Sequence, residues 1–188
     1  MERRTEVYDL LAQVLSYPRE EYPGVVRQCE QLLRQESPAA ARPLEHFAER
    51  VRTLPLEDLE ELFTRTFDLN PVCCLEVGWH LYGEDYNRGA FLVKMRQLLR
   101  SQGVAESTEL PDHLSNLLPL FGRLEEQEAR HLSVSFVLPA LRKMEEGLAG
   151  KNNPYEEVLH AVHGLLEVPD SESAAPVPQG AAAHRKEE

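Results

Sequence analysis

Cysteine and histidine side chains in the middle of the chain raise the question of a metal centre. Cys73 and Cys74 are adjacent, and His80 and His113 follow them. A structural zinc site needs two cysteines separated by about two to four residues and a second pair of ligands, and the sequence provides neither. We therefore interpret the cysteines as packed thiols and expect no metal and no resident cofactor. A small metal- or cofactor-carrier protein that uses Cys73, Cys74 and the histidines is the alternative.

Asp112 and His113, with Glu109 nearby, are a second group whose side chains suit chemistry, here acid–base catalysis. Successive helical residues point about 100° apart, so this adjacency alone does not bring them into contact. No G-x-S-x-G or H-E-x-x-H motif and no glycine-rich phosphate loop accompanies them. We expect no catalytic residue, although a hydrolase remains a third class. Asp112 is expected near a helix N-terminus, and His113 is expected to face solvent or a partner.

Aromatic residues lie beside a break in the helical pattern. Trp79, Tyr82, Tyr86 and Phe91 occur close together, and Trp79 is the only tryptophan. They have two interpretations: they cover the core where helices part, or they line a groove for an apolar peptide segment.

The composition restricts the class of partner. The chain has 188 residues and a formal net charge of −12. Because nucleic-acid binding depends on neutralising phosphates with Lys and Arg, an acidic chain argues against nucleic acid and fits a basic or neutral protein. The first residues contain no long apolar run, which predicts neither a signal peptide nor a membrane span. Three cysteines make no disulfide framework, so we expect a cytoplasmic protein.

Apolar residues recur at helical spacing along most of the chain. The pattern predicts a helix that Pro18 stops, a second opened by Pro23, a connector at Ser37–Arg42 and a third helix from Pro43. Thr53 is expected to cap a fourth helix, which ends near Asn70-Pro71.

Further helices are predicted beyond the irregular stretch Val72–Asn87. Val77–Tyr82 is expected to form a short helix that Gly83 ends, and Asp85 or Asn87 starts a long one. Pro111 is placed in the first turn of the next helix, and Pro119 should kink or end it. Asn153 caps the last helix.

The alternating segment Leu132–Phe136 is the one strand-like pattern in the sequence, and we interpret it as helix. The prediction is an all-α fold: a single-domain multi-helix bundle over residues 1–168, with a disordered tail at 169–188.

Two segments carry a resemblance to a known family. The stretch from Leu59 to Met95, LEELFTRTFDLNPVCCLEVGWHLYGEDYNRGAFLVKM, resembles the signature of the nitrate reductase delta-subunit family, NarJ. Glu109–Leu114, with the sequence ELPDHL, resembles the second motif of that family, which the wider TorD-like and DmsD-like group of molybdoenzyme assembly chaperones shares. The resemblance covers roughly Glu6–Leu166. Cys74 stands where the family pattern has a small residue.

The resemblance implies an all-helical, non-enzymatic chaperone. Such proteins bind the immature (apo) catalytic alpha subunit of a nitrate reductase or related molybdoenzyme, commonly through its N-terminal peptide, and hold it in the cytoplasm for molybdenum cofactor insertion. They do not insert into the membrane. Two sets of candidate partner-binding residues follow from it. The groove candidates are Phe63, Phe67, Trp79, His80, Tyr82 and Tyr86. The candidates for polar contacts with the partner, or for control of the conformation, are Glu76, Asp112 and His113.

Overall fold

The computed structural model describes residues 2–105 and 107–167, and within these ranges the chain is built from helices. The elements are α1 (Glu2–Val14), α2 (Tyr22–Glu36), α3 (Pro38–Val51), α4 (Leu56–Phe63), the π-helical turn η1 (Thr64–Asp68), α5 (Val77–Tyr82), α6 (Tyr86–Ser101), α7 (Leu114–Phe121), α8 (Glu126–Leu132), the π-helical turn η2 (Ser133–Val137), α9 (Leu138–Leu148) and α10 (Tyr155–Leu166). The all-α prediction is confirmed. The predicted tail at 169–188 lies outside the described residues.

Several helix boundaries follow the sequence signals. α5 ends at Gly83, whose positive φ of 58° suits a residue without a side chain. Asp85 caps α6 by accepting a hydrogen bond from the Asn87 amide at 2.8 Å. Asn153 likewise accepts the Tyr155 amide at the start of α10. The predicted helical character of Leu132–Phe136 is also confirmed, since η2 continues α8.

Three predicted boundaries are wrong. The segment Ser37–Arg42 is not a connector, because α3 begins at Pro38: proline is tolerated in a first turn, and the alanines that follow are strong helix formers. Thr53 does not cap α4. Pro55, in an extended conformation, occupies the N-cap position, and its ring fixes the backbone direction at the start of the helix. Pro111 is not in the first turn of α7, which begins only at Leu114 with His113 as its N-cap.

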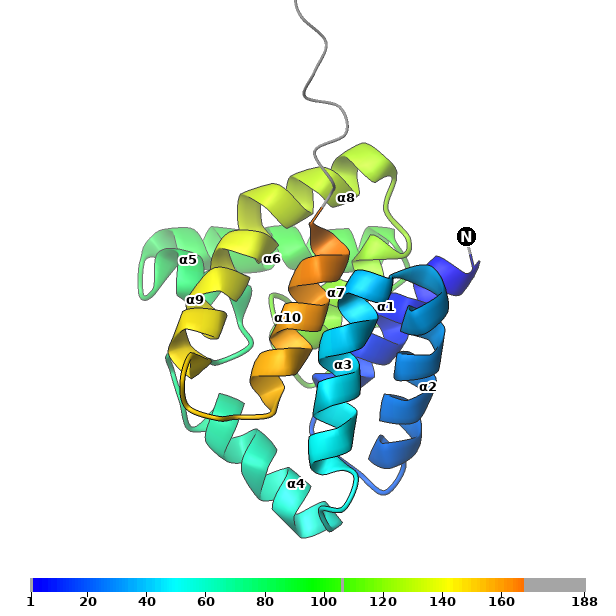
Figure 1. Ribbon diagram of the computed structural model, residues 1–188. Coiled ribbons are helices and arrows are strands. Elements are labelled where there is room, and N and C mark those ends of the chain that lie inside the picture. Colours follow the sequence, from blue (N-terminus) through cyan, green and yellow to red (C-terminus); the bar gives the residue numbers. More distant parts are fainter. Residues whose placement is uncertain (1, 106, 168–188) are drawn as a thin grey trace, which may run out of the picture.

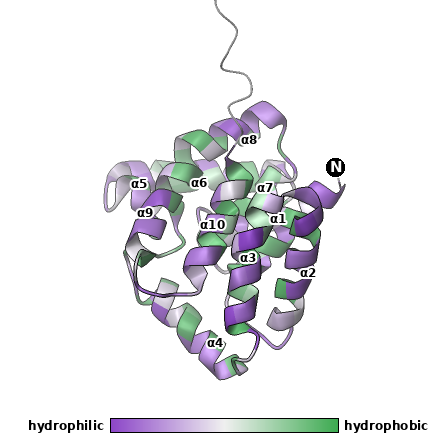
Figure 2. Cartoon of the chain, in the orientation of Figure 1, coloured by the Kyte–Doolittle hydropathy of each residue, from purple (hydrophilic) through white to green (hydrophobic). Residues whose placement is uncertain are grey.

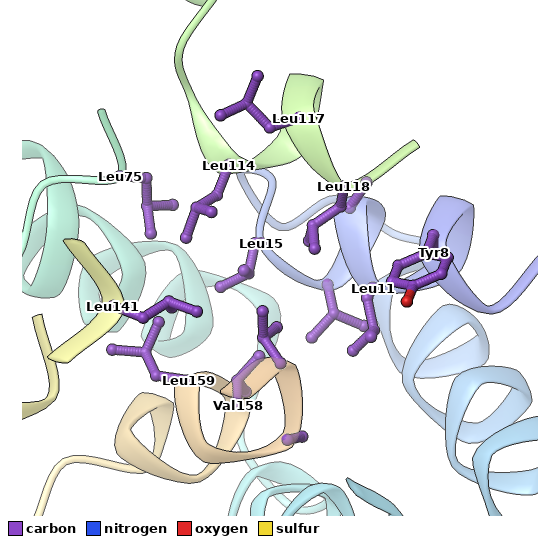
Figure 3. Close-up of a cluster of buried hydrophobic side chains, with 14 of the residues drawn as sticks. Tyr8, Leu11, Leu15, Leu75, Leu114, Leu117, Leu118, Leu141, Val158 and Leu159 are labelled. Carbon is purple, nitrogen blue, oxygen red and sulfur yellow. The ribbon is translucent and has the colours of Figure 1, made fainter. Parts of the chain in front are cut away.

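The hydrophobic core is enclosed by helices, several of which are distant from one another in the sequence. α10 packs along α3, and α1 packs against α7 and α2 (Figure 1). Most helices carry hydrophobic residues on one side and hydrophilic residues on the other, as the two colours along each ribbon show (Figure 2). Buried leucines from α7, α9 and α10 converge in the middle with Leu15, which directly follows α1; among them are Leu114, Leu141 and Leu159 (Figure 3). No helix in the described part of the chain combines the length and the apolar composition needed to cross a bilayer.

An aromatic cluster joins the α4–η1 segment to this core. The ring of Tyr155, fully buried in α10, lies 5.7 Å from that of Phe63 and 4.9 Å from that of Phe67 between ring centroids. Its hydroxyl lies 3.1 Å from that of Tyr22, which donates to the Val14 carbonyl at 2.9 Å. Since the Tyr22 proton is used in that bond, Tyr155 is the donor between the two hydroxyls. One residue therefore links α1, α2, η1 and α10.

This cluster predicts a graded loss of stability at Tyr155. Tyr155→Phe removes one buried hydrogen bond and should lower the free energy of unfolding by about 1 kcal/mol. Tyr155→Ala removes the whole ring and should cost about 3–5 kcal/mol. Urea unfolding followed by circular dichroism measures both. Equal losses in the two variants would contradict the central role of the ring.

Candidate functional site

A short backbone pairing brings the two predicted motif segments together. Glu76 and His113 form an isolated antiparallel β-bridge. The Val77 amide donates to the Asp112 carbonyl at 3.0 Å, and the Leu114 amide donates to the Leu75 carbonyl at 2.9 Å. Leu75 and Leu114 lie side by side and point into the core near Leu15 (Figure 3). The bridge is therefore anchored from beneath by buried leucines, and its upper side carries Glu76.

Asp112 caps α5 across this bridge. One carboxylate oxygen, Oδ2, accepts the Gly78 amide in the first turn of α5 at 2.8 Å. Glu76, the residue in the N-cap position of that helix, makes no side-chain capping bond. Asp112 is fully buried and its Oδ1 atom has no hydrogen-bond partner. Burial raises the pKa of this carboxyl group, while the Gly78 amide and nearby Arg88 act in the opposite direction.

Asp112 was expected near a helix N-terminus, and it lies just before His113, the N-cap residue of α7, but its carboxylate caps a different helix, α5. It stabilises the N-terminus of a helix 34 residues earlier, because the segment before α7 is held in the bridge. Gly78 is required for this contact: a Cβ atom there would lie 2.6 Å from Asp112 Oδ2 and 2.9 Å from the Phe91 ring. A side chain at position 78 would push α5 away from α7.

His113 is also buried rather than turned to solvent, with 8% of its surface exposed. Its Nδ1 atom accepts from the Ser115 amide at 3.2 Å and lies 2.7 Å from the Ser115 hydroxyl, so the imidazole caps α7. Burial lowers its pKa to about 4, against the opposing effect of Glu76. A histidine with so low a pKa is a weak base, which gives the hydrolase alternative no support.

His80 and the cysteines form hydrogen bonds within the chain. His80 Nε2 lies 2.7 Å from the Cys74 carbonyl oxygen and 3.8 Å from its thiol, and Lys143 donates to the His80 carbonyl. The buried Cys73 thiol donates to the Met144 carbonyl at 3.2 Å. Burial and Glu76 raise the pKa of the Cys74 thiol to about 12, so it stays protonated near neutral pH. In the described residues no group of three or more His, Cys, Asp and Glu side chains is arranged to hold a metal ion.

The aromatic candidates divide into three kinds. Phe63 and Phe67 are buried in the Tyr155 cluster, so in this conformation they do not reach the surface. Trp79 is half-buried; its indole donates to the Pro71 carbonyl at 3.0 Å and lies beneath the Arg88 guanidinium. The half-buried Tyr82 ring packs on Phe91, with centroids 5.6 Å apart. Tyr86 is 91% exposed.

Acidic residues surround the bridge. Asp68, at the end of η1, and Glu109, before α7, both lie within electrostatic range of Glu76. Partial burial, reinforced by repulsion from Asp68 and Glu76, raises the pKa of Glu109. Partial burial, with Glu76 adding to it, also raises the pKa of Asp68. The three carboxylates Asp68, Glu76 and Glu109 therefore lie close enough to influence one another, and we call them the acidic rim.

Exposed leucines adjoin two of these carboxylates. Leu69 follows Asp68 and is 75% exposed, and Leu110 follows Glu109 and is 42% exposed. Both leucines therefore add exposed apolar area next to the carboxylates of the acidic rim. Asp68, Leu69 and Leu110 were not singled out from the sequence. The sequence signal that could have found them is their position next to the residues of the two motifs. Helical periodicity does not reveal that these residues are exposed.

Comparison with known proteins places the chain in a family. The family model described as "Nitrate reductase delta subunit" matches residues 30–160. The chain belongs to this family. A relative from Bacillus subtilis (strain 168), named as the nitrate reductase molybdenum cofactor assembly chaperone NarJ, is 27% identical over 166 residues, which cover 87% of this chain and 90% of the relative.

The fold of this delta-subunit family member also matches a solved structure. A redox enzyme maturation protein from Archaeoglobus fulgidus aligns with a TM-score of 0.58 at 20% identity and covers 87% of this chain and 93% of that one. At this identity the match concerns the fold alone. The family match spans both the segment around Glu76 and the segment around His113 that the bridge joins.

The Asp112 cap predicts a difference between two substitutions. Asp112→Ala leaves the buried Gly78 amide without an acceptor and should cost about 1–3 kcal/mol of unfolding free energy. Asp112→Asn keeps an acceptor oxygen and removes the desolvated charge, so its loss should be smaller. Urea unfolding measures both, and emission of the single tryptophan, next to Gly78, reports whether α5 has moved. Equal effects of Ala and Asn would refute the cap.

The low pKa of His113 predicts an acid-sensitive fold. Because the folded-state pKa is about 4, the unfolded chain takes up a proton between pH 6.5 and 4 that the folded chain does not. Stability therefore falls as pH falls, and the His113 contribution should be about 2 kcal/mol between pH 7 and pH 5.

Unfolding free energies at these two pH values test this contribution. His113→Asn retains a capping side chain and should reduce the pH dependence by that amount. Substitution of the exposed His160 by Asn is the matched control and should leave it unchanged. A His113→Asn variant with the full pH dependence of the natural chain would contradict the assignment.

Proposed function

We propose that this chain is an assembly chaperone for the immature catalytic subunit of a respiratory nitrate reductase or a related molybdoenzyme. The observation that carries the proposal is the bridge between Glu76 and His113, which makes one surface from the two segments that resemble the family motifs. Family membership and the name of the Bacillus subtilis relative support the same role. The chain would act by binding in the cytoplasm and not by catalysis.

The proposed client segment is the N-terminal peptide of that subunit, with apolar residues and basic flanks. Leu69 and Leu110 offer exposed apolar area, and the acidic rim offers three carboxylates around it. The raised pKa values of Asp68 and Glu109 reflect in part a like-charge repulsion that a bound Lys or Arg would relieve. A basic peptide should therefore bind best when these carboxylates are ionised.

The half-buried aromatic residues of α5 form the second part of the proposed surface. Trp79 and Tyr82 are held by α6 and by the loop before α5, so they would provide rigid contact area at little entropic cost. Phe63 and Phe67, buried here, would support this surface from the core unless α4 and η1 move on binding. Their direct contact with a client stays a prediction, as does that of His80 and Tyr86.

Calorimetric titration of a synthetic peptide from the N-terminus of the host's nitrate reductase catalytic subunit tests the proposal. Glu109→Gln and Leu110→Ser should each weaken binding about tenfold, or about 1.4 kcal/mol. Affinity should also fall from pH 7 to pH 5, because the rim carboxylates with raised pKa values take up protons first. Absence of heat at high micromolar peptide would count against the client assignment.

Matched controls separate this surface from general effects. Glu146→Gln and Val134→Ser change an exposed acid and an exposed apolar residue outside the proposed surface, and should leave affinity unchanged. Trp79→Ala and Tyr82→Ala should weaken binding more than deletion of residues 169–188 does. If the deletion and the aromatic substitutions had equal effects, the role of α5 would be rejected.

A further inference from the structure

Helix α6 has a charge pattern opposite to that of the whole chain. The sequence contains 32 acidic and 20 basic residues, yet Tyr86–Ser101 contains Arg88, Lys94, Arg96 and Arg100 and no acid. Arg88 is turned toward Trp79, whereas the other three side chains are exposed. Glu84 and Asp85 precede the helix at its N-terminus, where their negative charges interact favourably with the helix dipole.

The outward face of α6 also carries apolar residues in a row. Tyr86, Ala90 and Val93 are spaced by four and three residues, which places them on one side of a helix. Tyr86 is 91% exposed and Val93 is 56% exposed. Gly89 lies beside the row, and a Cβ atom there would meet nothing within 4 Å. Small residues between two larger ones allow another backbone to approach closely.

The opposite side of the helix accounts for its packing within the chain. Phe91, Met95 and Leu99 are buried, and α6 contacts α5 and α7 and, through the Phe91 ring, Phe136 of η2. Lys94 leans toward the Phe136 ring, with Nζ 5.3 Å from its centroid. Within the described residues, the row from Tyr86 to Val93 takes no part in this packing. The inner face of α6 is thus closed by packing, whereas Tyr86 and Val93 on the outer face stay largely exposed.

We propose that the outward face of α6 (Tyr86, Ala90, Val93 and Lys94) is a second docking surface, for a protein that presents an acidic amphipathic helix. The exposed tyrosine and valine supply apolar contact, and a helix without acids favours a partner whose flanking residues are Glu or Asp. Arg96 and Arg100 also make contacts within the chain, so the inference rests on the apolar row and on the lack of acids in the helix.

An acidic protein suits this face better than an anionic membrane does. A helix that lies in a bilayer interface needs a wide apolar arc rich in large side chains. The row on α6 offers one aromatic and one branched aliphatic residue, separated by Gly89 and Ala90. A narrow row between small residues and cations is instead the geometry of a helix–helix contact.

Two designed peptides test the surface with the full-length chain. Both are helical with the same leucine face, and their flanking residues are all Glu in one peptide and all Lys in the other. Fluorescence anisotropy should show that the Glu peptide binds and that Val93→Asp combined with Lys94→Glu weakens it at least tenfold. The Glu109→Gln, Leu110→Ser double variant should bind the Glu peptide unchanged. The reverse result, with loss only in the rim variant, would overturn the proposal.

A second readout does not depend on the stability of these variants. A photo-crosslinking amino acid at position 93 should capture the Glu peptide and not the Lys peptide, whereas the same residue at the equally exposed position 134 should capture neither. No crosslink at position 93, or binding to phosphatidylglycerol vesicles in place of the peptide, would reject an acidic protein partner. Tyr86 is also a candidate contact for the client peptide, so these tests change Val93 and Lys94, whereas the calorimetric test of the client peptide changes Glu109 and Leu110.

Discussion

The arrangement of the site depends on the hydrogen bond that the buried Asp112 carboxylate accepts from Gly78. It joins segments 34 residues apart and is supported on both sides by backbone bonds from Val77 and Leu114. A carboxylate in an apolar interior is costly unless it is bonded, so displacement of α5 would leave both Asp112 and the Gly78 amide without a partner. That cost holds Trp79 and Tyr82 against α6 and keeps Glu76 paired with His113 in the bridge.

The buried, neutral histidines near the bridge contrast with the carboxylates that repel one another beside it. His113 and His80 are kept neutral by burial, so neither compensates the nearby carboxylates at neutral pH. Asp68, Glu76 and Glu109 repel one another, and none of them takes part in an ion pair among the described residues. The repulsion between like charges slightly destabilises the free protein. A cationic ligand would relieve this repulsion, and the relief would contribute to its binding free energy. The folded chain therefore has an electrostatic preference for cationic ligands in its unbound state.

Periodicity and capping residues were sufficient to predict the helical class and the limits of α5, α6 and α10, because these depend on local signals such as Gly83, Asp85 and Asn153. The start of α7 was missed because the extended conformation of residues 112 and 113 is imposed by a segment far away in the sequence. Whether Phe63 and Phe67 line a groove or are closed off in the core could not be predicted for a similar reason. A helical stripe shows which side is apolar, but only the tertiary position of Tyr155 decides whether that side is closed.

Asp112 and His113 illustrate how a motif combines structural and functional constraints. The family resemblance made both of them candidates for polar contacts with a partner or for conformational control, and the hydrogen bonds of each are directed inward, to Gly78 and to Ser115. Their neighbours Glu109 and Leu110 are exposed, and the bridge fixes where these neighbours lie. Substitution of either inward-facing residue would therefore disturb binding through position rather than through a lost contact. A loss of binding at Asp112 or His113 becomes evidence for direct contact only when stability and the emission of Trp79 are unchanged.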